Sequence, residues 1–500
     1  MWTSAILTAA LALGQPGGNL PAVVLPAPPP AEAAAPAAYP SGLDLTALEP
    51  PPAPADQPPP PIQITAPLLP PPAPAAAPAA PAAPAAAPPP RWFLMKELQG
   101  TYLGGQLDGN NIAIYGWMEG SFTGSTAGVS NEPMAWNDRS DRLLLQQMFI
   151  RMERTVVTTG TTMPTWGFRT DWLIGSDYRF TLPRGIWNGQ LVNSTDAQNL
   201  YGVDPVEFYG EVYIPNVQQG LDIKVGRFYT PWGEESIEAV STPLVSRSYT
   251  FNSGPPFTNT GVLATLTINP VWQVAAGLVD GNDIVFDNGQ EPRFLGFVKW
   301  TQPGSAATPP YGRNTVTLAA SLGRGKFNDS APMEAPEFAA GDTITTSGIG
   351  GETLGRNNIN VIDLLWTHTF NPVLSFASEN LYGWQTSIPL SSGIIVTDVQ
   401  PFGTGTGHWA STAEYLIYTM SSRTTATLRA ELFDDYEGTR TGFNGLYGEV
   451  TGGLAVKLRP GLIVRPELRY DWNGNSRAFN TAVDPSHDLF TAACDVILRW

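Results

Sequence analysis

Five arginines in this chain stand at alternate positions among apolar residues, and each has a carboxylate two positions away. They are Arg151 with Glu153, Arg169 with Asp171, Arg429 with Glu431, and the run Arg465, Glu467, Arg469 and Asp471. A period of two is the period of a β-strand, so the charges share one face and the apolar side chains share the other. Such a face could present a basic ladder that orients polar solutes. The charges could instead pair across neighbouring strands, and we expect pairing for most of them.

Three further carboxylates, Glu234, Glu235 and Glu238, open a stretch rich in Pro and Gly that runs from about 230 to 260. Carboxylates in a narrow aqueous passage concentrate cations and repel anions, so these residues are candidates for a pore constriction. The alternative is that they hold the stretch in place by pairing with arginines such as Arg227 or Arg247. Both hypotheses stay open, and the excess of carboxylates favours weak cation selectivity.

Enzymatic chemistry finds little support in the sequence. The three histidines, His368, His408 and His487, are expected at strand ends or in an outer loop rather than beside a nucleophile. The GIGG sequence at 348–351 lacks the lysine of a phosphate-binding loop, and FDDYEG at 433–438 lacks the ligand spacing of a calcium-binding EF-hand. We therefore expect no catalytic residue, no cofactor and no metal site.

The composition points to a wall that faces lipid. Only 14% of the residues are charged, against roughly 25% in soluble globular chains, and there are 15 tryptophans and 50 glycines. The net charge of −17 argues against nucleic acid as a partner. No apolar run of about 20 residues is present, so a membrane-spanning helix is not expected. A closed β-barrel is the other structure that satisfies its backbone in hydrocarbon.

The N-terminal part of the chain differs from the rest. An apolar run within residues 1–14 predicts a short secretory signal peptide, although the usual early Lys or Arg is missing. Residues 15–90 are rich in proline and alanine, which predicts a disordered tether that favours extended polyproline II structure. At about 3.1 Å per residue such a tether could cross a periplasm and reach peptidoglycan. The barrel is expected over 91–500.

Alternation and turn residues predict sixteen strands in this last part. They span about 112–122, 143–154, 166–176, 206–214, 221–229, 261–268, 271–280, 293–301, 314–324, 359–370, 373–384, 408–420, 423–434, 446–458, 461–472 and 489–500. Most are long enough to cross a bilayer when tilted. Tight connections after strands 4, 6, 10, 12 and 14 alternate with long ones, as in outer-membrane barrels, and sixteen strands would enclose a channel.

The last strand has the clearest alternation, and it ends on an aromatic residue, Trp500. It is expected to pair with the strand at 112–122 and to close the barrel, with Trp500 at the periplasmic rim. By analogy with other barrels, this terminal aromatic is a candidate signal for the outer-membrane assembly machinery. Cys494 lies on the apolar face of the strand and is expected to face lipid.

Five blocks resemble the OmpL-like β-barrel porin family of Gram-negative-type bacteria. They are GFRTDWLIGSDYRF at 167–180, VGRFYTPWGEESIEA at 225–239, SYTFNSGPPFTNTGVLAT at 248–265, RAELFDDYEGTRTG at 429–442 and VRPELRYDW at 464–472. The resemblance implies a bacterial outer-membrane barrel with passive transport. It implies neither catalytic residues nor a defined substrate.

The leading hypothesis is an outer-membrane porin. Ions and small polar solutes would diffuse through a water-filled lumen narrowed by an inward-folded loop after the fifth strand. The alternative is a structural or interaction protein whose tether links the membrane to the cell wall or whose outer loops bind a partner. Expected partners are outer-membrane lipid, the assembly machinery, peptidoglycan through the tether, and two further copies in a homotrimer, the last by analogy.

Overall fold

The computed structural model describes residues 91–500 apart from 184, 188–189, 191–199, 286–291, 304–311, 325–358, 390–403 and 481–482. The predicted signal peptide over 1–14, the predicted tether over 15–90 and the GIGG sequence lie outside the described residues.

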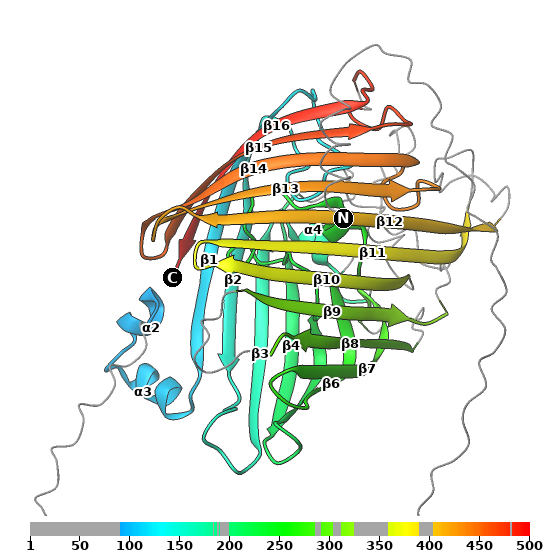
Figure 1. Ribbon diagram of the computed structural model, residues 1–500. Helices are drawn as coiled ribbons and strands as arrows, with labels where there is room; N and C mark the ends of the chain where they lie inside the picture. The colour runs from blue at the N-terminus through cyan, green and yellow to red at the C-terminus, as the bar shows by residue number, and fades with distance from the viewer. Residues whose placement is uncertain are drawn as a thin grey trace, which may run out of the picture. The chain divides into compact units, whose positions relative to one another are not determined.

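Sixteen strands within the described residues form one closed antiparallel barrel, in which each strand pairs with its neighbours in sequence (Figure 1). They are β1 Ala113–Ser125, β2 Leu143–Arg154, β3 Thr165–Gly175, β4 Gly202–Ile214, β5 Leu221–Tyr229, β6 Thr258–Thr267, β7 Trp272–Asn282, β8 Arg293–Thr301, β9 Arg313–Leu322, β10 Asn360–Asn371, β11 Leu374–Pro389, β12 Thr404–Thr419, β13 Thr424–Asp435, β14 Gly445–Arg459, β15 Leu462–Asn473 and β16 Asp488–Arg499. The predicted all-β barrel of about sixteen strands is confirmed.

β1 and β16 close the barrel. Their register runs from Trp117 opposite Arg499 to Ser125 opposite Thr491. Beyond it, Gly116 and Trp500 exchange two backbone hydrogen bonds of 3.1 and 2.9 Å. The closing pair predicted from the terminal alternation is therefore present.

Burial alternates along the strands as the sequence pattern predicts. In β15 the buried residues are Arg465, Glu467, Arg469 and Asp471, and the exposed ones are Pro466, Leu468 and Tyr470. In β16, Cys494 is exposed and Asp495 is buried. Because the sheet is closed on itself, the buried charged face is the inner wall and the exposed apolar face is the outer wall.

Connections of unequal length alternate around the barrel. The turns 268–271, 372–373, 420–423 and 460–461 are short and share one rim, and the connections 126–142, 176–201, 230–257 and 323–359 leave from the other rim. Both ends of the barrel, at β1 and β16, lie at the rim with the short turns.

Three strands extend four or five residues further than predicted toward the rim with the long connections. β4 begins at Gly202 instead of 206, β11 ends at Pro389 instead of 384, and β12 begins at Thr404 instead of 408. These extensions carry few apolar residues, so alternation gives no signal there. They are ordered by backbone pairing, with Gly202 opposite Gly175 and Pro389 opposite Thr404.

Short helices that the sequence did not indicate precede and interrupt the barrel. α2 (Phe93–Glu97) and α3 (Tyr102–Gly109) come before β1, while α4 (Tyr178–Thr181) and α5 (Tyr249–Ser253) lie in long connections. α2 packs near the chain end, where the guanidinium of Arg499 stacks 5.2 Å from the ring of Trp92. Among the described helices, none is long and apolar enough to cross a membrane.

The inner wall is not uniformly polar, in contrast to the expected polar lumen. Trp117 on β1 stacks on Phe149 of β2 with ring centroids 4.1 Å apart, and both rings are buried. They belong to an apolar cluster with residues from the long connections, including Trp136 and Ile237. Inward-facing rings on β1 and β2 thus pack against connections rather than against water.

Candidate functional site: the inner wall and the β5–β6 segment

Residues 230–257, here called the β5–β6 segment, contain the glutamates singled out in the sequence. Most of the segment is buried or half-buried. Its polar groups bond to side chains from the inner faces of five strands, β2, β11, β12, β13 and β15. The site is therefore built from one connection and from wall residues distant from it in sequence.

Glu235 is buried and binds the wall through Arg429 of β13. Its Oε1 lies 2.5 Å from Nη1 of Arg429, and its Oε2 accepts hydrogen bonds from the backbone and the hydroxyl of Ser248. The other arm of the guanidinium binds Glu449 on β14 at 2.7 Å. Arg429 thus joins two buried carboxylates, one from the segment and one from the wall.

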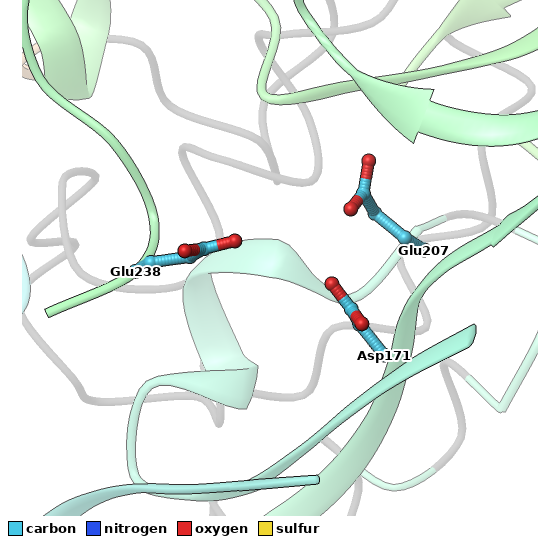
Figure 2. A group of neighbouring side chains, drawn as sticks. All are labelled: Asp171, Glu207 and Glu238. Atoms are coloured by element: carbon cyan, nitrogen blue, oxygen red, sulfur yellow. The ribbon is translucent and has the colours of Figure 1, made fainter. Parts of the chain in front are cut away.

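Glu238 lies in a group of three buried carboxylates (Figure 2). The other two are Asp171 of β3 and Glu207 of β4, and one oxygen of each residue lies within 4.8 Å of the others. Arg151 of β2 binds Asp171 at 2.6 Å and also binds Glu238. Arg169 approaches Glu207 to 3.6 Å. Two guanidinium groups thus offset part of the charge of this group, and Arg151 ties the segment to the wall.

Two wall glutamates bind backbone N–H groups of the segment. Glu431 accepts hydrogen bonds from the N–H groups of Tyr249 and Thr250, at 2.7 and 2.5 Å. Glu467 accepts from the N–H groups of Val245 and Ser246, at 2.7 and 3.2 Å. The helical turn of α5 and the chain before it are therefore fixed by carboxylates of β13 and β15.

Two wall arginines donate to carbonyl groups of the same segment. Arg465 donates to the carbonyls of Ala239 and Thr242, at 3.0 and 2.8 Å, while it also binds Asp495 of β16. Arg469 donates to the carbonyl of Arg247 at 2.6 Å and binds Asp471 at the same distance. The guanidinium groups of Arg465 and Arg469 thus each bind a wall carboxylate and the backbone of the segment at the same time.

The predicted ion pairs are met in part. Arg151 pairs with Asp171, Arg169 with Glu153 at 2.7 Å, and Arg469 with Asp471. Arg429 and Arg465 pair with Glu449 and Asp495 on the adjacent strands instead of with Glu431 and Glu467, which are bound to the segment. Pairing with a neighbouring strand therefore holds for Arg429 and Arg465, whereas Arg469 binds a carboxylate two residues along its own strand.

The arginines first considered as partners of the segment glutamates have other roles. Arg227 binds Asp204 at 2.6 Å, and Arg247, itself in the segment, donates to the backbone carbonyls of Ser236 and Val245. Burial lowers the pKa of Arg247, although the carboxylates of Glu119 and Glu235 oppose this shift. Glu235 and Glu238 are bound by Arg429 and Arg151, not by Arg227 or Arg247.

Glu234 is not bound by an arginine in the described part of the chain. Its backbone N–H donates to Oε2 of Glu379 on β11 at 2.9 Å. Burial, and then the neighbouring carboxylates of Glu379 and Glu235, raise the pKa of Glu234 to about 8. At neutral pH, Glu234 is therefore mostly protonated.

Several residues of this site were not singled out from the sequence, among them Gln147, Asp363, Glu379, Glu449 and Asp495. All lie on the inner face of a strand, so the alternation of polar and apolar residues could have identified them as inward-facing. Gln147 donates to the carbonyl of Ile237 and accepts from the N–H of Ala239. Which of these residues contact the β5–β6 segment depends on the register between strands. The residue pattern of a single strand does not reveal that register.

The histidines bond to neutral groups. Nδ1 of His368 lies 2.8 Å from Oδ1 of Asn314, and Nδ1 of His408 lies 2.9 Å from the hydroxyl of Tyr382. Nδ1 of His487 lies 3.1 Å from the carbonyl of Asn473.

Residues 111–499 match the protein family described as putative beta-barrel porin-2, OmpL-like. The chain belongs to this family. The resemblance seen in the five sequence blocks is thereby confirmed. The OmpL-like porins are outer-membrane barrels, so family and fold together point to a channel in the outer membrane rather than to an enzyme. None of the curated proteins compared with the chain matches it.

Solved structures that are similar to this chain include bacterial porins of low sequence identity. The anion-selective porin from Comamonas acidovorans is 10% identical with a TM-score of 0.46, over 78% of this chain and 99% of that one. The outer membrane channel DcaP of Acinetobacter baumannii is 8% identical with a TM-score of 0.45, over 78% and 97%. OprB of Pseudomonas putida is 10% identical with a TM-score of 0.48, over 80% and 96%.

Proposed function

We propose that this OmpL-like porin lets ions and small polar solutes diffuse passively through its lumen, and that the β5–β6 segment forms the constriction. The barrel order supports this proposal. In a closed ring of sixteen strands, β13 lies opposite β5. A segment that leaves β5 and binds Arg429 and Glu431 on the inner face of β13 has to cross the interior.

The observation that carries the proposal is the number and type of these attachments. Wall side chains bind the segment through ion pairs with Glu235 and Glu238 and through backbone bonds from Glu431 and Glu467. Each attachment is buried, and a buried charged hydrogen bond is costly to leave unmade. These attachments support a segment that is held at one place in the lumen, as a constriction requires.

Inner-wall side chains away from the segment support a remaining aqueous path. Lys224 on β5, Lys299 on β8 and Thr367 on β10 point into the barrel and are only half-buried. They lie toward the rim with the short turns. The lumen would therefore be wider on that side and would narrow where the β5–β6 segment crosses it.

Weak cation preference is the selectivity that the charges favour. The arginines at the constriction, Arg429, Arg151, Arg465 and Arg469, are all engaged with carboxylates. Glu234 and Glu379 are not balanced in this way within the described residues, and Glu234 adds its charge once the pH rises above its pKa of about 8. Carboxylates without a fixed countercharge attract mobile cations.

The remaining parts of the proposal concern the placement of the chain. Residues 1–14 act as a signal peptide, and residues 15–90 form a periplasmic tether that can reach peptidoglycan. The short-turn rim then faces the periplasm, and the assembly machinery recognises Trp500. The alternative function, an anchor that displays binding loops, differs from the channel in that it would not conduct.

A polar patch on the outer wall supports assembly into a homotrimer. Glu414 on β12 accepts hydrogen bonds from Ser378 on β11 and from Thr412, at 2.9 and 3.1 Å, and Asn380 donates to Ser378 at 3.0 Å. These residues alternate with inward-facing ones and therefore point out of the barrel. A carboxylate on a lipid-facing wall is unfavourable, and contact with another protomer would cover it.

Reconstitution of the full chain into a planar bilayer under a salt gradient tests the proposal. If the protein is a channel, discrete conductance steps appear. The sign of the reversal potential then shows a preference for cations. Glu234→Gln should move the reversal potential toward anions at alkaline pH, while Asp484→Asn in an exposed outer connection should not. A heat-modifiable, folded barrel that shows no conductance steps would rule out the channel.

A further inference from the structure

A cavity of about 220 Å³ lies between the two ends of the β5–β6 segment and the inner wall. Its lining comes from the start of the segment, at 229–237, from its end, at 251–257, and from Glu379 of β11. A water molecule takes about 30 Å³ in the liquid, so a space of this size holds several waters or one small solute. The cavity is therefore a candidate place for a solute inside the barrel.

Four aromatic rings line the cavity: Tyr229, Trp232, Phe251 and Phe257. Phe251 and Phe257 stack with ring centroids 5.0 Å apart, and they and Tyr229 belong to or pack against the apolar cluster around Trp136. Tyr229, Trp232 and Phe251 are nonetheless only half-buried. Rings that are held by packing and remain partly accessible offer flat apolar faces to a solute.

Trp232 is held by a different apolar cluster. It packs against residues of the inner wall that include Leu263 of β6 and Leu295 of β8. The next residue, Gly233, has a φ of 107°, which residues with a side chain rarely adopt. The packing and the backbone turn together hold the indole at the cavity before any solute arrives.

Two buried polar atoms of the lining have no hydrogen-bond partner among the described residues. They are the indole nitrogen of Trp232 and the hydroxyl oxygen of Tyr229. The indole N–H is a donor only, whereas the hydroxyl group both donates and accepts. Buried polar groups are normally hydrogen-bonded, so these two call for a ligand that brings acceptor oxygens.

The carboxylates of the lining are already bonded within the protein. Glu235 pairs with Arg429, and Glu379 accepts the backbone N–H of Glu234 and interacts with Asp363. Neither is an isolated charge that requires a metal ion or an ammonium group. Because two carboxylate oxygens offer about four lone pairs, both groups can still accept further hydrogen bonds.

We propose that this cavity binds one neutral, polyhydroxylated ring of the size of a monosaccharide. Its oxygens accept hydrogen bonds from Trp232 and Tyr229, its hydroxyl groups donate to Glu379, and its C–H face lies on an aromatic ring. An ammonium ion has no acceptor for the indole N–H, and an anion would lie beside two carboxylates. The proposal rests on the proposed function in one respect, since the bound solute has to enter the lumen.

Saturation-transfer difference NMR tests the proposal on the full-length protein, folded in a detergent that has no sugar headgroup. The probe is D-glucose. Saturation passes from protein protons to a bound ligand, so we expect saturable transfer to the ring C–H protons of glucose. Tetramethylammonium and acetate, which lack hydroxyl groups, should show no transfer that depends on Trp232.

Variants locate the site. Trp232→Leu removes a ring and a donor and should weaken glucose binding about tenfold or more. Tyr229→Phe removes the hydroxyl group alone and should weaken binding about two- to tenfold. Trp272→Leu, at an exposed tryptophan of the outer wall, should leave binding unchanged. Heat-modifiable migration shows that each variant is folded, and Tyr229→Phe suffices if Trp232→Leu does not fold.

Three results would overturn the proposal. The first is the absence of saturable transfer to glucose from the folded wild-type protein. The second is transfer that is unchanged in both folded variants of the cavity, which would place the sugar elsewhere on the barrel. The third is transfer to tetramethylammonium that Trp232→Leu abolishes, which would make the cavity a site for organic cations.

The NMR measurement does not require conduction, so it separates this proposal from the proposed channel. Conductance steps without glucose binding would refute the ligand and leave the channel in place. Glucose binding without conductance steps would refute the channel and leave the ligand in place.

Discussion

At the scale of single residues, the inner wall is organised by shared arginines. Arg429 and Arg151 each bind one carboxylate of the wall and one of the β5–β6 segment. Removal of one partner leaves other charges buried and unpaired, which costs far more than an exposed ion pair contributes. The segment is therefore held by a few residues that cannot be replaced singly.

Arg429→Gln tests this dependence. It leaves Glu235 and Glu449 buried without their shared countercharge, so we expect a loss of about 3–5 kcal/mol in the free energy of unfolding. Urea unfolding in detergent micelles measures it. The double variant Arg429→Gln with Glu449→Gln should recover part of the loss. A loss below about 1 kcal/mol, as for a surface pair, would contradict the account.

The raised pKa of Glu234 predicts how selectivity depends on pH. Burial and the carboxylates of Glu379 and Glu235 raise this pKa to about 8 from an ordinary value of 4.5. The carboxyl group is thus neutral well below pH 8 and charged above it. The preference for cations should increase as the pH rises through about 8, and Glu234→Gln should remove this increase. Reversal potentials at several pH values measure it, and a decrease with rising pH would refute the assignment.

The same shift has a consequence for stability. An acid whose pKa is higher in the folded state favours folding while it is protonated, and its contribution falls as the pH rises from about 4.5 toward 8. Wild type should therefore lose stability relative to Glu234→Gln across this interval. Thermal unfolding of both proteins at pH 5 and pH 8 compares them, and an equal change in both would count against the buried, protonated state.

At the scale of elements, the strands and the closure of the barrel could be predicted from the sequence. This is because the alternation of polar and apolar residues is a local property of each strand. β2, β5 and β8 begin and end where the pattern placed them. The partners of Arg429 and Arg465 were not predictable, since they depend on register between strands. The helices α2 and α3 carried no strong periodic signal, and α5 is fixed by Glu431 from β13.

The closing pair of strands contains a matched pair of glycines that tests it. A Cβ at Gly116 would lie 1.9 Å from the carbonyl oxygen of Phe149 and 2.7 Å from the ring of Trp500, whereas at Gly120 its nearest contact would be 3.7 Å. Gly116→Ala should therefore lower the heat-modification temperature and the yield of folded barrel, and Gly120→Ala should not. Equal behaviour of the two variants would show that close packing at Trp500 is unimportant for closure.

At the scale of the whole molecule, the outer wall has two different regions. One faces lipid, and the other is a candidate contact between protomers. The outer wall of β15 carries residues such as Leu468 and Tyr470, whereas that of β11 and β12 carries Glu414 and its hydrogen-bonded neighbours. If this patch is a contact between protomers, Glu414→Leu should lower the fraction of oligomer in native mass spectra. If the patch faces lipid, the same change should leave the oligomer intact and stabilise the barrel, which would refute the contact.

In the proposed channel, the β5–β6 segment crosses the lumen and sets its width. Ser236 lies half-buried in the segment and lines the cavity beside Glu235. In a Cys494→Ser background, Ser236→Cys can be treated with a bulky thiol reagent while single channels are recorded, with Asp484→Cys as the outer control. We expect a stepwise fall in conductance for the first variant and none for the second. An unchanged conductance after complete modification of the cysteine at position 236 would contradict it.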